Sequence, residues 1–305
     1  MNDIVIPDAV RQAVTDSVGE FVKECSRADP ATTARDILAF PVREQAARRL
    51  ESYVPLAGKR LLDVGSGMGL MLATLIKCYG VDGYGVEPGA VGFSSSLKTS
   101  RVLLAANGID TGRVIAACGE QLPFPDCSFD VVYSANVLEH VEDPARVLYE
   151  SIRVLRPCGT LHFEIPNFLS YWEGHYLVPM PPIVFRPLLP WWMKTVFRRD
   201  PAFARTLQPL NPVWCRRQIR RLRRTFPLTL ITLGEDLFLR RLEQPFVFNG
   251  ELQARLVPVI AVIQKLNVGN WIGRLIVAAQ GFYPMYLTVQ RDAAAAAELG
   301  LPNRV

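Results

Sequence analysis

A short apolar segment that runs directly into closely spaced glycines constrains this chain more than any other feature. Residues 60–64 read Arg-Leu-Leu-Asp-Val, a buried-strand pattern, and Gly65, Gly67 and Gly69 follow at every second position. An apolar helix is expected directly afterwards, over 70–79. Gly65 permits a tight turn, Gly67 permits close backbone approach to a ligand, and the first N–H groups of the helix favour an anionic or carboxylate-bearing ligand. The pattern predicts a strand–turn–helix binding site.

The segments that follow alternate between strand and helix patterns. Further strands are expected at 83–87, 113–117, 129–134, 160–165, 228–233 and 283–290, and helices at 91–107, 143–155 and 213–225. Strands that alternate with helices pair in parallel through right-handed crossovers. We therefore predict an α/β fold with a doubly wound, Rossmann-like sheet.

An acidic residue at the end of the second expected strand supplies another ligand contact. Glu87 lies 22 residues after Gly65, and a carboxylate there can accept two hydrogen bonds from a ribose diol. The glycine spacing is GxGxG, whereas dinucleotide folds carry GxGxxG, and position 70 is Leu. This spacing disfavours an NAD-dependent oxidoreductase. Turn glycines without any ligand are the purely structural alternative.

Several segments in order resemble the motifs of class I S-adenosylmethionine-dependent methyltransferases of the type 11 kind, over roughly residues 55–170. They are Leu61–Gly69, Tyr84–Pro88, Glu120–Asp126, Ser128–Val132, Asn136–His140 and Leu155–Leu161. The resemblance implies a seven-stranded sheet whose last strand is antiparallel and lies between the fifth and sixth. It also implies S-adenosyl-L-methionine as the cofactor.

The same resemblance implies roles for matching positions. Asp63 and the glycines would hold the methionine portion, Glu87 the ribose, the loop at 118–120 the adenine, and the loop at 134–138 would face the sulfonium. Many relatives have Asp where this chain has Cys118, so Glu120 or a backbone carbonyl is expected to replace that contact. The expected cofactor-binding residues are Asp63, Gly65, Ser66, Gly67, Gly69, Glu87, Pro88, Gly119, Glu120 and Asn136.

Three histidines are the natural bases near neutral pH. His162 lies inside the fifth expected strand and is interpreted as a buried sheet histidine. His175 lies beyond the carboxyl end of that strand, where open α/β sheets bind ligands, in a Glu-x-His-Tyr stretch similar to one in bacterial methyltransferases of cell-surface glycan or lipid pathways. We predict His175, Glu173 and His140 as catalytic residues. A structural role in a lid is the alternative for His175, and a role in orienting its loop is the alternative for His140.

Positive charge is concentrated in one region. Residues 168–241 contain 13 Lys+Arg and 4 Asp+Glu, a net +9, although the whole chain carries only +5. The pair Trp191-Trp192 and the arginine-rich segment 216–224 lie in this region. Basic and aromatic side chains together are typical of a protein surface that binds anionic membranes or a phosphate-bearing substrate. A solvated amphipathic helix is the alternative for 216–224, and nucleic acid is not expected because no binding module is recognised.

The cysteine pattern and the chain ends complete the expectations. The six cysteines form no CxxC pair and no histidine lies at metal-ligand spacing from them, so we expect reduced thiols and no metal site. The start of the chain lacks a signal-peptide pattern, and no apolar run approaches the ~18 residues of a membrane span. A cytoplasmic location with peripheral contact at the inner face of the membrane is expected.

The predicted divisions of the chain are an N-terminal helical segment (1–54), a cofactor-binding core (55–167), an insertion or lid over the acceptor site (168–212), the rest of the core with a helical insertion (213–292) and a tail (293–305).

The predicted function is methyl transfer from S-adenosylmethionine to a hydroxyl of a small-molecule, glycan or lipid-linked acceptor. The alternative is a binding protein that retains the cofactor and serves as a scaffold at a membrane, without turnover. Fold does not specify the acceptor, and the motifs predict no oligomeric state.

Overall fold

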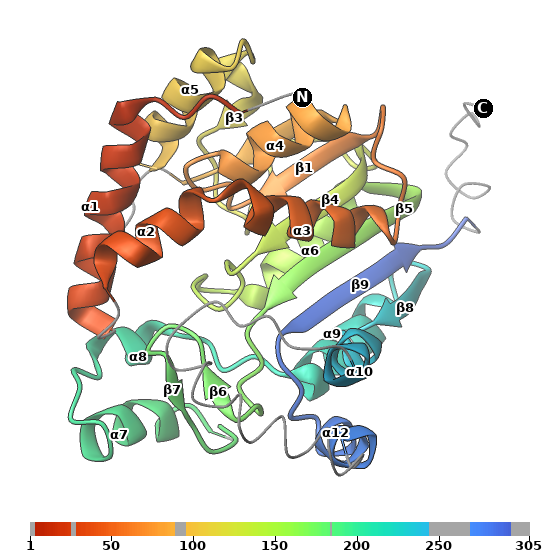
Figure 1. Ribbon diagram of the computed structural model, residues 1–305. Coiled ribbons are helices and arrows are strands. Elements are labelled where there is room, and N and C mark those ends of the chain that lie inside the picture. Colours follow the sequence, from red (N-terminus) through yellow and green to blue (C-terminus); the bar gives the residue numbers. More distant parts are fainter. Residues whose placement is uncertain (1–3, 26–28, 89–95, 184, 244–268, 294–305) are drawn as a thin grey trace.

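A seven-stranded sheet organises the computed structural model, which describes residues 4–25, 29–88, 96–183, 185–243 and 269–293 (Figure 1). The strand order is β3-β2-β1-β4-β5-β9-β8. β9 is antiparallel to both of its neighbours, and the remaining neighbours pair in parallel. The doubly wound sheet and the inserted last strand are therefore confirmed. The strands are β1 (Arg60–Val64), β2 (Asp82–Val86), β3 (Val114–Ile115), β4 (Phe129–Ala135), β5 (Leu155–Ile165), β8 (Leu228–Thr232) and β9 (Met285–Arg291).

Helices cover both faces of this sheet, and the strand sequences show why. Leu61 packs with α3 and α4, whereas its neighbour Leu62 packs with α6 and α9 on the opposite face. Successive side chains of a strand point to opposite faces, so a strand that is covered on both sides reads as a continuous apolar run. The helices are α1 (Asp8–Cys25), α2 (Pro30–Leu38), α3 (Phe40–Glu51), α4 (Leu70–Tyr79), α5 (Ser96–Ala106), α6 (Pro144–Val154), α9 (Pro212–Leu222), α10 (Glu235–Glu243) and α12 (Gly269–Ala278), with a 3-10 turn η1 at Thr111–Arg113.

The segment between β5 and α9 forms a small unit of its own. It contains the hairpin β6 (Trp172–Glu173) and β7 (Val178–Pro179), followed by α7 (Leu188–Thr195) and α8 (Ala202–Thr206). Its apolar cluster includes Tyr176 and Met193 together with Cys25 at the end of α1. Residues far apart in the sequence therefore meet beside the lower part of the sheet in Figure 1. This contact brings the N-terminal helix next to the segment predicted to cover the acceptor.

Some expected boundaries differ from the structure. α6 ends at Val154 and β5 begins at Leu155, five residues earlier than the strand predicted at 160–165. Cys158 has a φ of 62°, and a Cβ on Gly159 would lie 2.8 Å from the carbonyl oxygen of Arg156, so an irregularity sits inside the strand instead of ending the helix. The first part of the helix expected at 91–107, most of the apolar segment at 251–280 and the tail from 294 onward lie outside the described residues.

No helix in the described part of the chain is long and apolar enough to span a bilayer.

Candidate active site

The three turn glycines differ in what surrounds them. All have positive φ, at 73°, 54° and 78° for Gly65, Gly67 and Gly69. A Cβ on Gly65 would lie 2.4 Å from Val137, and one on Gly69 would lie 3.0 Å from Ser100, so both glycines are required by packing. A Cβ on Gly67 would meet nothing within 4 Å. Gly67 therefore borders open space where a ligand can approach the backbone.

Two carboxylates converge on this turn. Asp63 at the end of β1 is 3% exposed and Glu87 after β2 is 8% exposed. The N–H of Gly67 donates to Oε2 of Glu87 at 2.9 Å. Burial and the charge of Glu87 raise the pKa of Asp63 to about 7, and burial also raises the pKa of Glu87. Within the described residues no cation pairs with Asp63. A ligand that brings an ammonium group and a diol fits this pair.

The remaining residues predicted to bind the cofactor would contact it mainly through backbone atoms. The hydroxyl of Ser66 points at Gly85 of β2, only 2.7 Å from where a Cβ there would lie, and it has no hydrogen-bond partner. Asn136 adopts a φ of 54°, and its N–H donates to the carbonyl of Glu164 at 2.9 Å. Pro88 is exposed, and Gly119 and Glu120 are half-buried. The structure places these residues after β1, β2, β3 and β4, at the carboxyl edge of the sheet.

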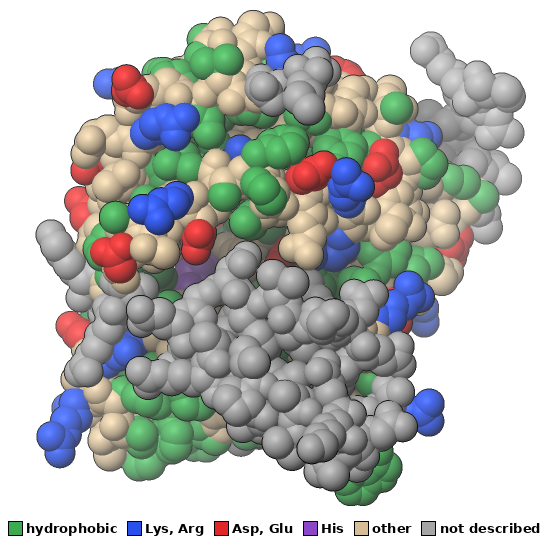
Figure 2. Space-filling view, in the orientation of Figure 1, with side chains coloured by type: hydrophobic (Ala, Val, Ile, Leu, Met, Phe, Trp, Pro, Cys, Tyr) green, Lys and Arg blue, Asp and Glu red, His purple; other side chains and the backbone are tan. Residues whose placement is uncertain are grey.

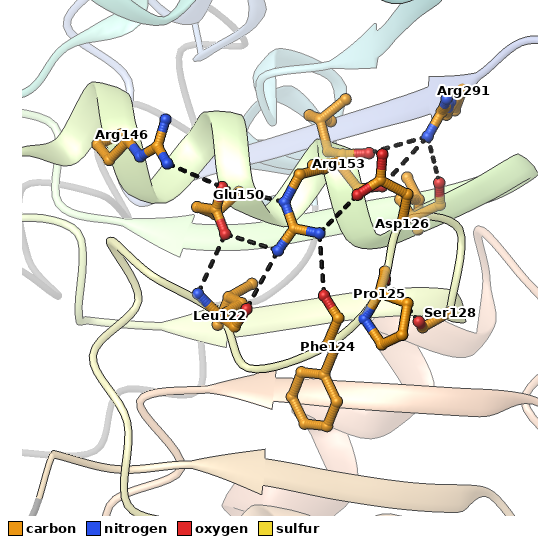
Figure 3. Close-up of polar contacts among 11 residues, drawn as sticks. Leu122, Phe124, Pro125, Asp126, Ser128, Arg146, Glu150, Arg153 and Arg291 are labelled. Atoms are coloured by element: carbon orange, nitrogen blue, oxygen red, sulfur yellow. Dashed lines mark hydrogen bonds and ion pairs between the residues drawn. The ribbon is translucent and has the colours of Figure 1, made fainter.

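Two arginines of α6 hold the loop after β3: Arg146 donates to the carbonyl of Glu120, in the part predicted to border the adenine, and Arg153 holds residues 122–126. Arg153 donates to both carboxylate oxygens of Glu150, to Asp126 and to the carbonyls of Leu122 and Phe124 (Figure 3). The N–H of Leu122 also donates to Glu150, whose side chain is 4% exposed. Burial opposes ionisation of Glu150, but these hydrogen bonds outweigh it and hold its pKa below the ordinary value. Sequence reasoning missed this fastening, because Arg153 is 27–31 residues from the loop contacts it makes.

The three predicted catalytic residues lie together. Nδ1 of His175 is 2.7 Å from Oε1 of Glu173, and Nε2 of His175 is 3.3 Å from Nε2 of His140. Glu173 is 1% exposed, and its other oxygen accepts the N–H of Tyr176 at 2.5 Å. A buried carboxylate at Nδ1 favours the tautomer with the proton on that nitrogen. The lone pair of Nε2 in His175 therefore faces His140.

A fourth residue, Glu139, completes the cluster and was not predicted. It is fully buried, and neither of its carboxylate oxygens has a hydrogen-bond partner among the residues that the structure describes. Its Oε1 lies 3.7 Å from Nε2 of His140 and 3.8 Å from Nε2 of His175. Burial raises the pKa of Glu139 to about 7. The available signal was an acidic residue directly before His140, just after β4.

Burial and charge act differently on the two histidines. Burial lowers the pKa of His140 to about 4, with a further contribution from His175. Burial also opposes the charged form of His175, but the hydrogen bond and the charge of Glu173 raise its pKa above the ordinary value. The two rings are therefore electrostatically distinct although they touch.

Distant segments enclose this cluster. Phe203 of α8 lies 5.4 Å from the ring of His175 and 5.8 Å from that of His140, and Phe21 of α1 lies 6.3 Å from His175. The N–H of Gln208 donates to the carbonyl of Glu139 at 2.8 Å. Figure 2 shows histidine surface in the recess between the upper and lower parts of the molecule. The cluster is buried on most sides and reaches the surface there.

His162 is a sheet histidine, as expected. It is 1% exposed, its Nδ1 lies 2.8 Å from the hydroxyl of Thr288, and its ring stacks between those of Tyr133 and Tyr286. Burial lowers its pKa to about 3, so it is neutral in ordinary conditions.

The basic region forms two distinct surfaces. α9 buries Cys215 and Ile219 and exposes Arg217, Arg220 and Arg221, which is the amphipathic helix considered as the structural alternative. Trp191 in α7 is 55% exposed and borders a groove of about 430 Å³. The groove is lined by Arg186, Pro187, Pro190, Trp191, Lys194, Pro201 and Arg205.

Comparison with known sequences finds a methyltransferase domain. The methyltransferase domain family matches residues 62–163. An uncharacterized methyltransferase from Mycobacterium avium (strain 104) is 38% identical over 119 residues, which is 39% of this chain and 44% of that protein. An uncharacterized protein from Mycobacterium tuberculosis (strain H37Rv) is 30% identical over 122 residues, which is 40% of this chain and 41% of that protein. The chain thus covers less than half of the length of these curated relatives.

Solved structures share the fold at low identity. A protein assigned as a sarcosine dimethylglycine methyltransferase from Galdieria sulphuraria has a TM-score of 0.53 at 15% identity, covering 94% of this chain and 99% of that one. An S-adenosylmethionine-dependent methyltransferase from Mesorhizobium loti has a TM-score of 0.50 at 18% identity, covering 82% and 98%. The [4+2]-cyclase SpnF has a TM-score of 0.50 at 18% identity, covering 94% and 96%.

Proposed function

We propose, from the premise that this chain contains a class I S-adenosylmethionine-dependent methyltransferase domain, that it transfers a methyl group from this cofactor to a hydroxyl of its acceptor. The observation that carries the proposal is the pair of His175 and buried Glu173, at the same sheet edge as the glycine turn. A histidine held in this way is suited to remove a proton from a hydroxyl.

The residues of the turn fit the cofactor. Gly67 leaves open space, Asp63 is a buried carboxylate suited to an ammonium group, and Glu87 is suited to the ribose diol. When bound, the cofactor supplies an electrophilic methyl group on its sulfonium. The backbone of Gly119 and Glu120, whose loop Arg153 fastens to α6, would border the adenine.

The acceptor would lie beside the histidines. Nε2 of His175 takes the proton of the acceptor hydroxyl as its oxygen attacks the methyl group, while Glu173 keeps the imidazole oriented and stabilises its charge. Nε2 of His140 lies 3.3 Å from that nitrogen, so the acceptor hydroxyl would replace His140 as its neighbour. The segment 168–212 would serve as a lid that excludes water, because its Phe203 already packs on both rings.

The acceptor is proposed to be a small, glycan or lipid-linked molecule with a free hydroxyl. Trp191 and the cations around its groove would bring the protein to an anionic membrane surface where such molecules reside. The fold alone does not decide between methyl transfer and the alternative of a scaffold without turnover, since a [4+2]-cyclase also shares it. The pair of Glu173 and His175 favours turnover, because a scaffold has no use for an oriented base.

The test is His175→Ala, assayed with labelled S-adenosylmethionine and a set of hydroxyl acceptors that includes bacterial lipid and glycan extracts. Turnover should fall by about 10²–10⁴-fold, the usual scale for a positioned base. Affinity for S-adenosylhomocysteine, measured by calorimetry, should stay within about twofold, because the ring nitrogens of His175 contact Glu173 and His140 and the turn is assigned to the cofactor. Parallel loss of turnover, thermal stability and S-adenosylhomocysteine binding would instead establish a structural lid residue.

A further inference from the structure

The side chains of Glu139, His140 and His175 bring three potential metal ligands to one point. One ligand atom from each lies within 4.8 Å of the other two. Glu139 is the decisive member, because it is fully buried and, within the described part of the chain, both of its oxygens lack a hydrogen-bond partner. A buried carboxylate without a partner is costly, and a bound cation would relieve that cost.

The distances match coordination of a small divalent ion. Nε2 of His140, Nε2 of His175 and Oε1 of Glu139 form a triangle with sides of 3.3, 3.7 and 3.8 Å. A point equidistant from the three atoms lies about 2.1 Å from each, which equals the usual Zn–N and Zn–O distances of about 2.0–2.2 Å. An ion would therefore fit with only small shifts of these side chains.

A second carboxylate orients one of the ligands. Glu173 accepts from Nδ1 of His175 at 2.7 Å and is itself held by the N–H of Tyr176. Histidines that bind metal commonly donate their other ring N–H to a carboxylate, which fixes the tautomer and increases ligand basicity. The pair of Glu173 and His175 has this arrangement.

We propose that Glu139, His140 and His175 bind a divalent first-row transition-metal ion, with Glu173 as the outer carboxylate. Two imidazoles and one carboxylate select ions such as Zn²⁺, Co²⁺, Mn²⁺ or Fe²⁺ over Mg²⁺ and Ca²⁺, which favour all-oxygen sites. The side chain of His140 is 30% exposed, which leaves an open side for a further ligand. No metal site was expected, because the cysteines form no CxxC pair and no histidine lies at ligand spacing from them; His140 and His175 lie 35 residues apart.

The consequence for chemistry rests on the proposed function. An ion and a proton compete for Nε2 of His175. With the ion bound, an acceptor hydroxyl at the open position would coordinate it and lose its proton to solvent water more readily, since a coordinated hydroxyl has a lowered pKa. The cluster would then activate the acceptor through the ion in place of the histidine base.

The experiment measures ion binding directly on the full-length chain after treatment with a chelator. Zn²⁺ is titrated in competition with a chromophoric chelator, and Co²⁺ is followed by its visible absorption. We expect one ion per chain and an absorption band typical of two nitrogen ligands and one or more oxygen ligands. Glu139→Gln, His140→Ala and His175→Ala should each weaken binding by at least about 100-fold, and Glu173→Gln by about 10–100-fold.

Glu142→Gln is the matched control, because Glu142 is an exposed acid three residues from Glu139. It should bind Zn²⁺ like the unmodified chain. Absence of one-to-one binding, or equal binding by Glu139→Gln and Glu142→Gln, would overturn the proposal. S-adenosylhomocysteine is titrated separately: a chain that binds this ligand but no ion refutes the metal site alone, whereas one that binds the ion but not this ligand supports the metal site and refutes the proposed function.

Discussion

The cofactor side and the acceptor side of this sheet edge are built in opposite ways. On the cofactor side, the turn and its carboxylate partner lie close in sequence, with Gly67 only 20 residues from Glu87. On the acceptor side, His140 meets His175 across 35 residues, and Phe21 of α1 packs against His175. A site made from one strand–turn–helix unit and the next strand is set by local conformation. A site assembled from several distant segments depends on how those segments pack.

The largest expected effect tests the local character of the cofactor side. Gly67→Val should reduce the affinity for S-adenosylhomocysteine by more than about 10³-fold, because the branched side chain would fill the open space beside the turn. Its φ of 54° also adds roughly 1–2 kcal/mol of backbone strain. Calorimetry measures the affinity, and thermal unfolding followed by circular dichroism measures the loss of stability that the strain causes.

Gly80→Val is the matched control for that strain. Gly80 ends α4 with a φ of 66°, and a Cβ there also meets nothing within 4 Å. This variant should lose similar stability but keep its affinity for S-adenosylhomocysteine. Equal affinities of the two variants would show that Gly67 does not border the cofactor.

A second substitution tests whether the cofactor side also depends on contacts between residues far apart in the sequence. Arg153→Met removes three hydrogen bonds to the loop after β3 and two to Glu150, which stays buried with fewer partners. Loss of one partner of a buried ion pair typically costs about 3–5 kcal/mol, and we expect the lower end because Leu122 and Arg146 still contact Glu150. Urea unfolding measures the loss.

The comparison variant is Arg146→Met, since Arg146 is 50% exposed, contacts the same carboxylate at 3.3 Å and makes one hydrogen bond to the loop, at the carbonyl of Glu120. It should cost no more than about 1 kcal/mol. The contribution of Glu150 has a defined pH dependence. Its pKa is lowered in the folded chain, so the stabilisation is present above the unfolded value of 4.5 and is lost as pH falls through the folded value. Equal losses in the two variants would contradict the special role of Arg153.

The same contrast explains what the sequence could predict. The glycine turn and the strand positions follow from periodicity, because each is encoded within a few neighbouring residues, whereas the antiparallel β9 was expected from the resemblance to a known family. The grouping of His175, Glu173 and His140 was also expected from the strand ends they follow. Glu139 was missed, since an acidic side chain next to a loop histidine usually faces solvent, whereas here it is fully buried in a loop that Phe203 and the backbone of Gln208 contact.

A pH titration sharpens the comparison from the cofactor side. The folded pKa of Asp63 is about 7, above the ordinary value of 3.8, so the unliganded chain loses stability as pH rises from about 4 through 7. An ammonium group on the ligand prefers the ionised carboxylate. Affinity for S-adenosylhomocysteine should therefore rise by about tenfold between pH 6 and pH 8, with proton release on binding. Asp63→Asn should bind weakly at both pH values, and a pH-dependent affinity in this variant would assign the effect to another group.

The smallest expected effect concerns binding to membranes by the groove on the outer surface of the acceptor side. Trp191 and Lys194 of α7 border one groove with Arg186, and all three are exposed. If this groove rests on an anionic bilayer, Lys194→Gln should weaken binding to vesicles with phosphatidylserine by about 1 kcal/mol, roughly fivefold, as expected for one cation near a charged membrane. Lys98 is an exposed residue of α5. Lys98→Gln removes the same charge elsewhere and should leave the binding to these vesicles unchanged. Sedimentation at low and high salt measures vesicle binding by both variants. Identical binding by the two variants, or equal binding to neutral vesicles, would refute an electrostatic role of this groove at a membrane.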